Sequence, residues 1–116
     1  MSKFLAEKII NMINEIQVKL INSVLLKYSP EKIGLFGSRV RGDGVANSDL
    51  DILVSFKHDG KSPYSLLELL SIEKLLADKL GFPVKIVNEK NIKNSILRQS
   101  IFNDLVVIYQ KAENVA

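Results

Sequence analysis

The sequence predicts an α/β (α+β) fold, a small mixed β-sheet of about four strands covered by helices. Three observations support this fold class: long segments with apolar residues at helical spacing, four short apolar runs between them, and Gly or Pro at their boundaries. Segments of the two kinds alternate along the chain, which is typical of a sheet packed against helices. The length of 116 residues suits a single domain over 1–116.

Composition narrows the class of protein further. Apolar residues make up 47% of the chain and charged residues 25%, enough for a buried core and a polar surface. The absence of cysteine excludes disulfides and thiolate metal sites, and it suits a cytoplasmic protein. Neither a signal peptide nor a membrane-spanning run is evident, so we expect no membrane association.

The charge pattern does not favour nucleic acid as a ligand. The net charge is +3 with a sequence pI of about 9.2, but the basic residues are scattered. Aromatic residues reach only 7% and Trp is absent, whereas nucleic-acid binders usually combine a basic stripe with aromatic platforms. The charge therefore permits a polyanionic ligand without requiring one.

The first element is predicted to be a long helix over 1–29. Ser2 is a suitable N-cap, and Ser29-Pro30 ends the helix because a residue before proline avoids the α region. The predicted apolar face comprises Leu5, Ile9, Ile13, Ile16, Leu20 and Val24, widened by Ile10, Val18, Ile21 and Leu25. We expect this face to be core, with part of it as an alternative surface for a homo-oligomer or another partner.

The segment 33–56 contains two predicted strands joined by a polar loop. Residues 33–36 form a short apolar strand, and 37–47 form a loop rich in glycine. The next strand runs from Leu50 to Phe56 and is entered through Ser48-Asp49.

The remaining elements complete the alternating pattern. A helix is expected over 63–80, capped by Ser62 and followed by Gly81. A strand over 83–87, a helix over 91–103 and a strand over 105–109 follow. The buried helical positions are predicted to be Leu66, Leu69, Leu70, Ile72, Leu75, Leu76 and Leu80, then Ile92, Ile96, Leu97 and Ile101. The polar tail 111–116 is expected to fray.

The turn after the first strand has the composition of an anion site. Gly37 lets the backbone approach a bulky ligand, and Ser38 supplies a hydroxyl at the start of a short helix. Backbone N–H groups at a helix start suit phosphate. Arg39 and Arg41 add mobile positive charge, with solvated loop charges as the alternative interpretation.

Two carboxylates open the second strand. Asp49 and Asp51 are two residues apart, so alternation in a strand points both side chains to the same side. Adjacent carboxylates repel unless a cation neutralises them, and such oxygen ligands suit Mg²⁺. A phosphate turn beside a carboxylate pair is what metal-assisted phosphoryl or nucleotidyl transfer requires.

Together these residues resemble a family signature. Gly37-Ser38, three residues, Gly42, five residues, Ser48-Asp49, one residue and Asp51 are similar to the Gly-Ser…Gly…Ser-Asp-x-Asp pattern of minimal nucleotidyltransferases. These small proteins are relatives of the DNA polymerase beta superfamily. Six fixed residues at roughly 7% each would coincide by chance about once in 10⁷ placements. The signature is therefore specific, and the order of elements agrees with it over nearly the whole chain.

The resemblance implies a nucleotidyltransferase fold and an activity. A nucleoside triphosphate, with ATP as the expected donor, would bind with one or two Mg²⁺ ions, and a nucleoside monophosphate would move to a hydroxyl. Gly37, Ser38, Arg39, Arg41 and Ser48 would bind the nucleotide phosphates, and Asp49 and Asp51 would be the catalytic metal ligands. Many such proteins are antitoxins paired with an all-helical HEPN toxin, so the resemblance also implies a HEPN-type partner.

One position departs from the family pattern. The strand after the long helix normally reads Val-Asp-Leu-Val in the family, whereas this sequence has Val84-Lys85-Ile86-Val87. The resemblance therefore places Lys85 where a third carboxylate would bind a second metal and accept a proton. Lys85 as an ordinary exposed strand residue is the alternative, in which case Glu68, Glu73 or Glu89 could supply the third carboxylate.

Three hypotheses about function follow. The first is an active nucleotidyltransferase, and the second is a relative that binds nucleotide and a protein partner but transfers slowly because of Lys85. The third is a small nucleic-acid-binding or structural module that has kept the fold. A steep salt dependence of DNA binding would distinguish the third from the other two.

Overall fold

A four-stranded mixed sheet lies at the centre of the computed structural model, which describes residues 13–44, 48–56 and 65–112. Its strands are β1 (Lys32–Phe36), β2 (Leu50–Ser55), β3 (Val84–Asn88) and β4 (Val106–Gln110). The order across the sheet is β3-β2-β1-β4, with β2 and β3 parallel and the other neighbours antiparallel. The predicted fold class, with a mixed sheet of four strands, is confirmed.

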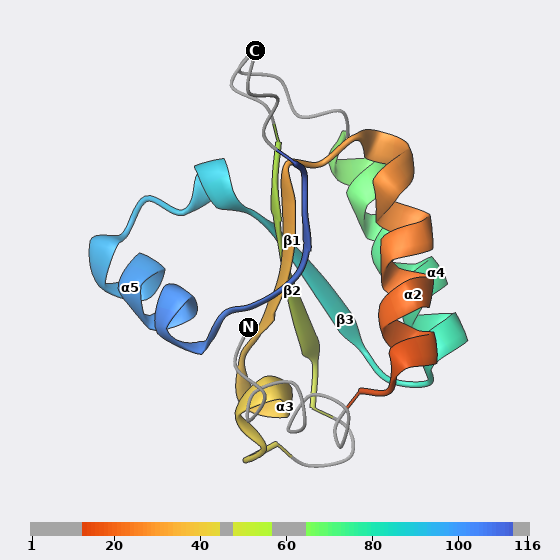
Figure 1. Cartoon of the computed structure of the whole chain (residues 1–116), viewed down its shortest axis with the longest axis horizontal. Coiled ribbons are helices and arrows are strands. Elements are labelled where there is room, and N and C mark those ends of the chain that lie inside the picture. Colours follow the sequence, from red (N-terminus) through yellow and green to blue (C-terminus); the bar gives the residue numbers. More distant parts are fainter. Residues whose placement is uncertain (1–12, 45–47, 57–64, 113–116) are drawn as a thin grey trace.

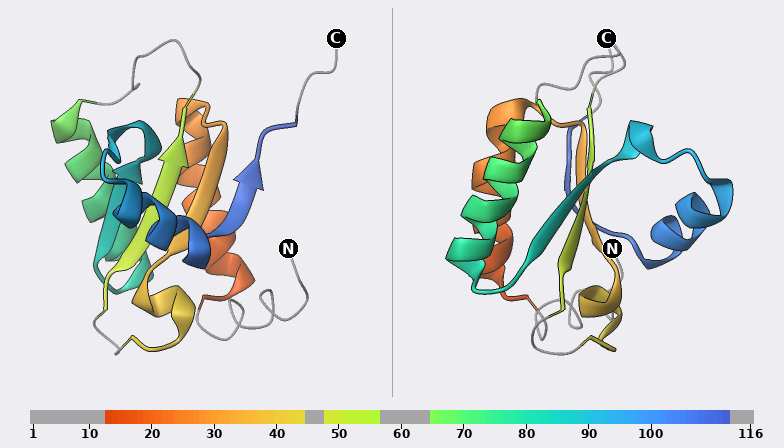
Figure 2. Two further views of the ribbon diagram at one scale, coloured as in Figure 1. Left: turned by 90° about the vertical axis from the view of Figure 1, so that its left-hand side faces the viewer. Right: turned by 180° about the vertical axis from the view of Figure 1, so that it is seen from behind.

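Helices cover both faces of this sheet. Figures 1 and 2 show α2 (Glu15–Leu25) and α4 (Leu66–Leu80) side by side on one face and α5 (Ser95–Asp104) on the other. The four-residue helix α3 (Ser38–Arg41) follows β1 at one end of the sheet. Single 3₁₀ turns, η1 (Leu26–Tyr28) and η2 (Glu89–Asn91), follow α2 and β3. None of the helices in the described ranges is long and apolar enough to cross a membrane.

Alternation along the strands divides the core into a large and a small cluster. The large cluster fills the space under α2 and α4, and its fully buried members include Ile21, Leu25, Ile33, Leu35, Leu50, Ile52, Val54 and Leu76. The small cluster lies under α5 and consists of Phe36, Leu53 and Ile101, with Val87 and Leu105 packed against it. Within the described residues, α5 is the only helix packed on this second face.

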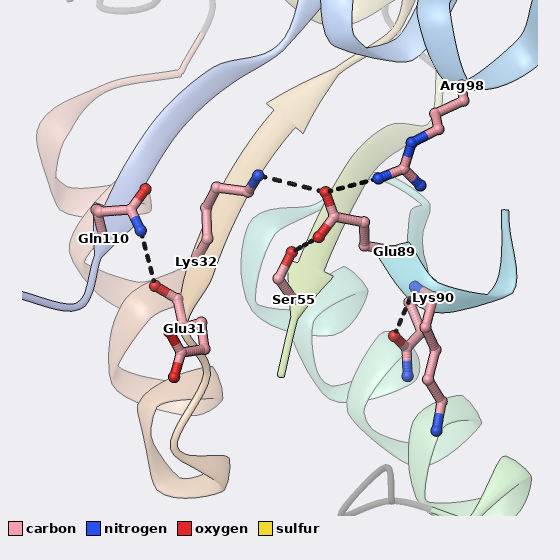
Figure 3. Close-up of polar contacts among 8 residues, drawn as sticks. Glu31, Lys32, Ser55, Glu89, Lys90, Arg98 and Gln110 are labelled. Carbon is pink, nitrogen blue, oxygen red and sulfur yellow. Dashed lines mark hydrogen bonds and ion pairs between the residues drawn. The ribbon is translucent and has the colours of Figure 1, made fainter. Parts of the chain in front are cut away.

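A polar cluster fastens η2 and α5 to the sheet at the end of β2 (Figure 3). The Glu89 carboxylate accepts a hydrogen bond from the Ser55 hydroxyl and pairs with Lys32 at 3.3 Å and with Arg98 at 3.7 Å. Lys32 and Arg98 also lie over the Phe102 ring, with Nζ and Cζ at 4.9 and 5.1 Å from its centroid. A cation over an aromatic face is attracted to the ring in addition to its ion pair. Because Arg98 and Phe102 belong to α5, these contacts help to hold that helix against the sheet.

The predicted continuous helix over 1–29 is wrong. Helix α2 begins at Glu15, and Asn14 caps it by accepting a hydrogen bond from the Gln17 backbone N–H at 2.9 Å. The Gln17 side chain accepts from the Asn14 N–H in return, so the capping box starts a new helix here. The helix ends at Leu25, before η1 and a left-handed Ser29, and the expected cap Ser2 lies outside the described residues.

Several residues predicted to be buried are exposed. Ile16 is 78% exposed, and the other exposed members are Leu66, Leu70, Leu75, Ile96 and Leu97. Each helix meets the sheet along one stripe only, so α4 buries Ile72, Leu76 and Leu80 and partly buries Leu69. Its exposed leucines are Leu66, Leu67, Leu70 and Leu75. In α5 only Ile101 is buried, because the helix lies alone on its face of the sheet.

Side-chain caps shift the other helix boundaries. Ser65, rather than Ser62, caps α4 by accepting from the Glu68 N–H. Asn94 caps α5, so the predicted helix over 91–103 begins only at Ser95. The tail is held at its first residue, because the Lys111 N–H donates to the Glu31 carbonyl at 2.8 Å. Residues 57–64, which include the predicted helix start at 63, lie outside the described residues. The same holds for residues 113–116 of the tail that was expected to fray.

We expect the substitution Leu76→Ala to destabilise the protein by about 2–5 kcal/mol, because it removes a fully buried side chain and leaves a cavity under α4. Leu67→Ala on the same helix is the matched control, because Leu67 is 77% exposed and its loss should change stability by less than about 0.5 kcal/mol. Urea unfolding monitored by circular dichroism measures both. Equal destabilisation by the two variants would contradict the assigned core.

Candidate functional site

The turn after β1 brings the backbone against a carboxylate. Gly37 has φ 88° and ψ −170°, a conformation that side chains disfavour, and a Cβ added there would collide with the Asp51 carboxylate. The antiparallel register explains this approach, because it places Phe36 opposite Asp51. Only glycine lets the turn and the carboxylate come this close. Gly37 and Asp51, separated by 14 positions in the sequence, therefore share one site.

Two serine hydroxyls border the same turn. The Ser38 carbonyl accepts hydrogen bonds from the N–H groups of Gly42, Asp43 and Gly44 at 3.0 to 3.2 Å, which folds the chain back after α3. A Cβ added at Gly44 would lie 2.8 Å from the Ser48 Oγ and 3.2 Å from the Ser38 Oγ. Ser38 and Ser48, both predicted site residues, thus bring their hydroxyl oxygens close to the same point beside Gly44.

The carboxylate pair lies at the start of β2. Asp51 is the second residue of β2, and Asp49 lies directly before the strand begins. Both residues are half-buried. Desolvation raises the pKa of Asp51, and the nearby Asp49 charge raises it further; Lys85 and Arg41 act in the opposite direction. The two carboxylates therefore interact, and Lys85 and Arg41 do not offset the burial of Asp51.

Lys85 lies beside Asp51 on the neighbouring strand. The parallel register of β2 and β3 pairs Asp51 with Lys85, and it pairs Leu50 with Val84 and Ile52 with Ile86. Val84 and Ile86 are buried, whereas Lys85 is exposed on the opposite face. The expectation that Lys85 and Asp51 share a face of the sheet is confirmed, and their attraction follows from it.

The two arginines of the turn have different surroundings. Arg39 is buried, with 8% exposure, and its Nε donates to the Ser48 carbonyl at 3.1 Å. Its guanidinium lies over the Phe82 ring, with Cζ 3.8 Å from the centroid. The expectation that Arg39 is a mobile cation is therefore wrong, because the fold encloses its side chain in protein contacts.

Arg41 is half-exposed at the surface and links two elements. Its Nη1 pairs with Asp104 Oδ2 at 2.8 Å and its Nε with Asp43 Oδ2 at 3.2 Å. Asp104 is the last residue of α5, so this pair joins α3 to the helix on the site's face of the sheet. Arg41 also lies near enough to Asp51 to lower the pKa of that carboxyl.

The other acidic residues considered for the site have other places in the fold. The Glu73 carboxylate accepts from the Ile86 N–H at 2.7 Å, and Glu89 belongs to the cluster at the far end of β2. Glu68, together with Tyr28 and Leu75, lines a hollow between α4 and η1. Helix α4 covers the face of the sheet opposite to α5 (Figure 1), so this hollow lies away from Asp51. Within the described residues, no group of three or more acidic or histidine side chains is arranged to hold a metal.

Two contributors to the site were missed from the sequence. Phe82, in the loop before β3, supplies the ring under Arg39, and Asp104 supplies the partner of Arg41. Neither belongs to a motif, and the only local signal is that each stands at or just after a helix end. Their contacts join positions far apart in the chain, so spacing could not reveal them.

Comparison with known proteins identifies the family. Residues 19–114 match the family described as polymerase beta, nucleotidyltransferase. A candidate protein adenylyltransferase of Methanocaldococcus jannaschii is 35% identical over 101 residues, covering 87% of this chain and 99% of that protein. The similarity therefore extends over nearly the full length of both chains.

Solved structures share the fold. A toxin–antitoxin crystal structure with AMP-PNP has a TM-score of 0.67 at 23% identity, covering 81% of this chain and 73% of that one. A complex of a tri-AMPylated HEPN toxin from Shewanella oneidensis with its MNT antitoxin has a TM-score of 0.62 at 19% identity, covering 84% and 72%. With the family match over most of the chain and the Gly-Ser turn placed against the carboxylate pair, this protein belongs to the polymerase beta nucleotidyltransferase family.

Proposed function

We propose that this protein binds Mg²⁺ and ATP and transfers AMP to a hydroxyl group on a helical HEPN-type partner. The observation that carries the proposal is the contact between the Gly37 backbone and the Asp51 carboxylate. This contact supports the proposal, because it brings a turn suited to phosphate next to a carboxylate suited to a cation. The relative named as a candidate protein adenylyltransferase supports ATP as the donor and a protein as the acceptor.

The phosphates of the nucleotide would bind at the turn. The Ser38 and Ser48 hydroxyl oxygens both lie close to Gly44, and the half-exposed Arg41 follows Ser38 in α3 and lies near Asp51. Arg41 would give up its ion pairs with Asp43 and Asp104 and pair with a phosphate instead. Its planar guanidinium suits this role, because it can donate two parallel hydrogen bonds to one phosphate. Arg39 has no such role in this proposal, because its guanidinium is enclosed between Ser48 and Phe82.

Asp49 and Asp51 suit a bound Mg²⁺. The pKa of Asp51 is raised by burial and by Asp49, which supports a place for a cation beside this carboxylate. A divalent cation held by one or two carboxylates and the substrate phosphates would supply that charge. When bound, Mg²⁺ polarises the phosphoryl oxygens and stabilises the charge on the leaving group.

The reaction needs a group that accepts a proton. The acceptor hydroxyl oxygen forms a bond to the α-phosphorus, the bond to the bridging oxygen of the β-phosphate breaks, and pyrophosphate leaves. The hydroxyl proton must move to a base. A protonated Lys85 has no lone pair to accept it and cannot coordinate a second metal.

A second candidate function follows from Lys85. The register that pairs Asp51 with Lys85 favours a protein that binds nucleotide and partner while transferring slowly. The Lys85 ammonium would stand in for part of a second cation by attraction to Asp51, without the chemistry of a metal. Both candidates share the same nucleotide site and differ in rate.

The double substitution Asp49→Asn, Asp51→Asn should abolish the metal-dependent part of ATP binding. Removing both carboxylates should weaken Mg²⁺-dependent affinity by at least about 100-fold, since even the loss of outer-shell partners costs roughly 10–100-fold. Calorimetric titration with ATP in Mg²⁺ and in EDTA measures this. Asp78→Asn, an exposed residue on α4, is the control. Unchanged Mg²⁺ dependence in the double variant would refute the site.

Asp51→Asn should stabilise the metal-free protein at neutral pH. The pKa of Asp51 is raised above 3.8 in the folded state, so the folded protein binds this proton more tightly than the unfolded chain. Stability therefore falls as pH rises through the window from 3.8 to the raised pKa, and the loss persists above it. The variant avoids this loss. Its advantage in melting temperature, measured in EDTA, should shrink as pH falls toward 3.8. A pH-independent difference would count against the assignment.

Lys85→Asp should accelerate transfer while leaving ATP affinity similar or higher. Restoring a carboxylate beside Asp51 supplies a proton acceptor, and a general base commonly contributes about 10²–10⁴-fold in rate. Mass spectrometry of a HEPN-type acceptor incubated with Mg²⁺ and ATP measures the gain of AMP, with Lys93→Asp as the charge-matched control. Fast wild-type transfer that Lys85→Asp does not improve would show that Lys85 does not limit the reaction.

A further inference from the structure

Arg39 joins three segments that meet at the carboxylate pair. Its backbone belongs to the short helix after Gly37, its Nε donates to the carbonyl of Ser48, and its guanidinium lies on Phe82. Ser48 directly precedes Asp49. Phe82 precedes Pro83, whose carbonyl accepts from the Leu50 N–H at 2.8 Å. One buried side chain thus contacts the phosphate turn, the approach to Asp49 and the approach to β3.

The two carboxylates differ in how their backbone is held. Asp51 lies within β2 and is paired on both sides, with Phe36 of β1 and Lys85 of β3. Asp49 lies before the first residue of β2, outside the ladder of either neighbour. Sheet pairing therefore sets the position of Asp51, while the position of Asp49 depends on what holds the residue before it.

We propose that Arg39 is a positioning residue that, through the Ser48 carbonyl, holds Asp49 at the separation from Asp51 that a shared Mg²⁺ requires. The inference rests on the proposed function, in which both carboxylates bind Mg²⁺. Ligands that share a cation must be held within about 0.5 Å of the productive geometry by groups that are themselves locked. The buried stack on Phe82 supplies that lock, because it leaves the guanidinium little freedom.

Arginine suits this role better than lysine. The Arg39 guanidinium lies over the Phe82 ring while its Nε donates to the Ser48 carbonyl, so one planar group makes both contacts at once. A lysine ammonium is a point charge that could approach either partner but lacks the planar face. The four-residue helix α3 depends on such contacts, because helices this short are not stable by themselves.

The test is a calorimetric titration with Mg²⁺ at a fixed ATP concentration. It compares the wild type with Arg39→Lys, Arg39→Gln and Phe82→Leu. We expect the Mg²⁺ concentration at half-maximal binding to rise about tenfold or more in both Arg39 variants, as for other outer-shell changes. Phe82→Leu keeps Arg39 and removes the ring beneath it, so a smaller rise in the same direction is expected.

Arg98→Gln is the matched control, because Arg98 also lies over a phenylalanine and pairs with an acceptor, far from Asp49. Its Mg²⁺ midpoint should stay that of the wild type. Lower melting temperatures with an unchanged midpoint in the Arg39 variants would overturn the inference. If those variants do not fold, an unchanged midpoint in Phe82→Leu overturns it equally. Loss of Mg²⁺ dependence in Asp49→Asn, Asp51→Asn beside unaffected Arg39 variants would leave the proposed function standing and refute the inference alone.

Discussion

The close approach of the Gly37 backbone to the Asp51 carboxylate is the constraint around which the site is arranged. It requires a residue without a side chain at a left-handed position, and it requires β1 and β2 to pair so that Phe36 lies opposite Asp51. The first requirement is local and the second depends on the sheet. A shift of the register by one residue would turn Asp51 toward α2 and α4, into the apolar core.

Electrostatics explains why this arrangement calls for a ligand. Burial raises the pKa of the Asp51 carboxyl and the Asp49 charge raises it further, while Lys85 and Arg41 reduce the shift without cancelling it. Arg41 is held partly by Asp43 and Asp104, which limits the charge that it offers to Asp51. The protein's own cations therefore do not offset the burial of Asp51, and perturbed pKa values of this kind are common at functional sites.

The two faces of the sheet have different tasks. The face under α2 and α4 carries most of the apolar core, whereas the other face carries the carboxylates at one end and the Glu89 cluster at the other. Helix α5 is held in place by the ion pair between Arg98 and Glu89 and, at its last residue, by the ion pair between Asp104 and Arg41. It covers this face without enclosing Asp51. The core can thus be rigid while Asp51 stays half-exposed.

The element order, the mixed sheet and the residues of the site motif could be predicted from the sequence, because strand alternation, turn residues and the Gly-Ser…Ser-Asp-x-Asp spacing are local signals. The place of Lys85 beside Asp51 was an implication of the family resemblance, and the parallel register of β2 and β3 agrees with it. The start of α2 at Glu15, directly after its cap Asn14, and the exposure of Ile16 could not be predicted from the sequence. A side-chain cap competes with continuation of the helix, and helix packing buries only one stripe of residues. Only the tertiary structure decided that Arg39 faces inward, because its partners come from a loop and a strand approach that the chain reaches by separate routes.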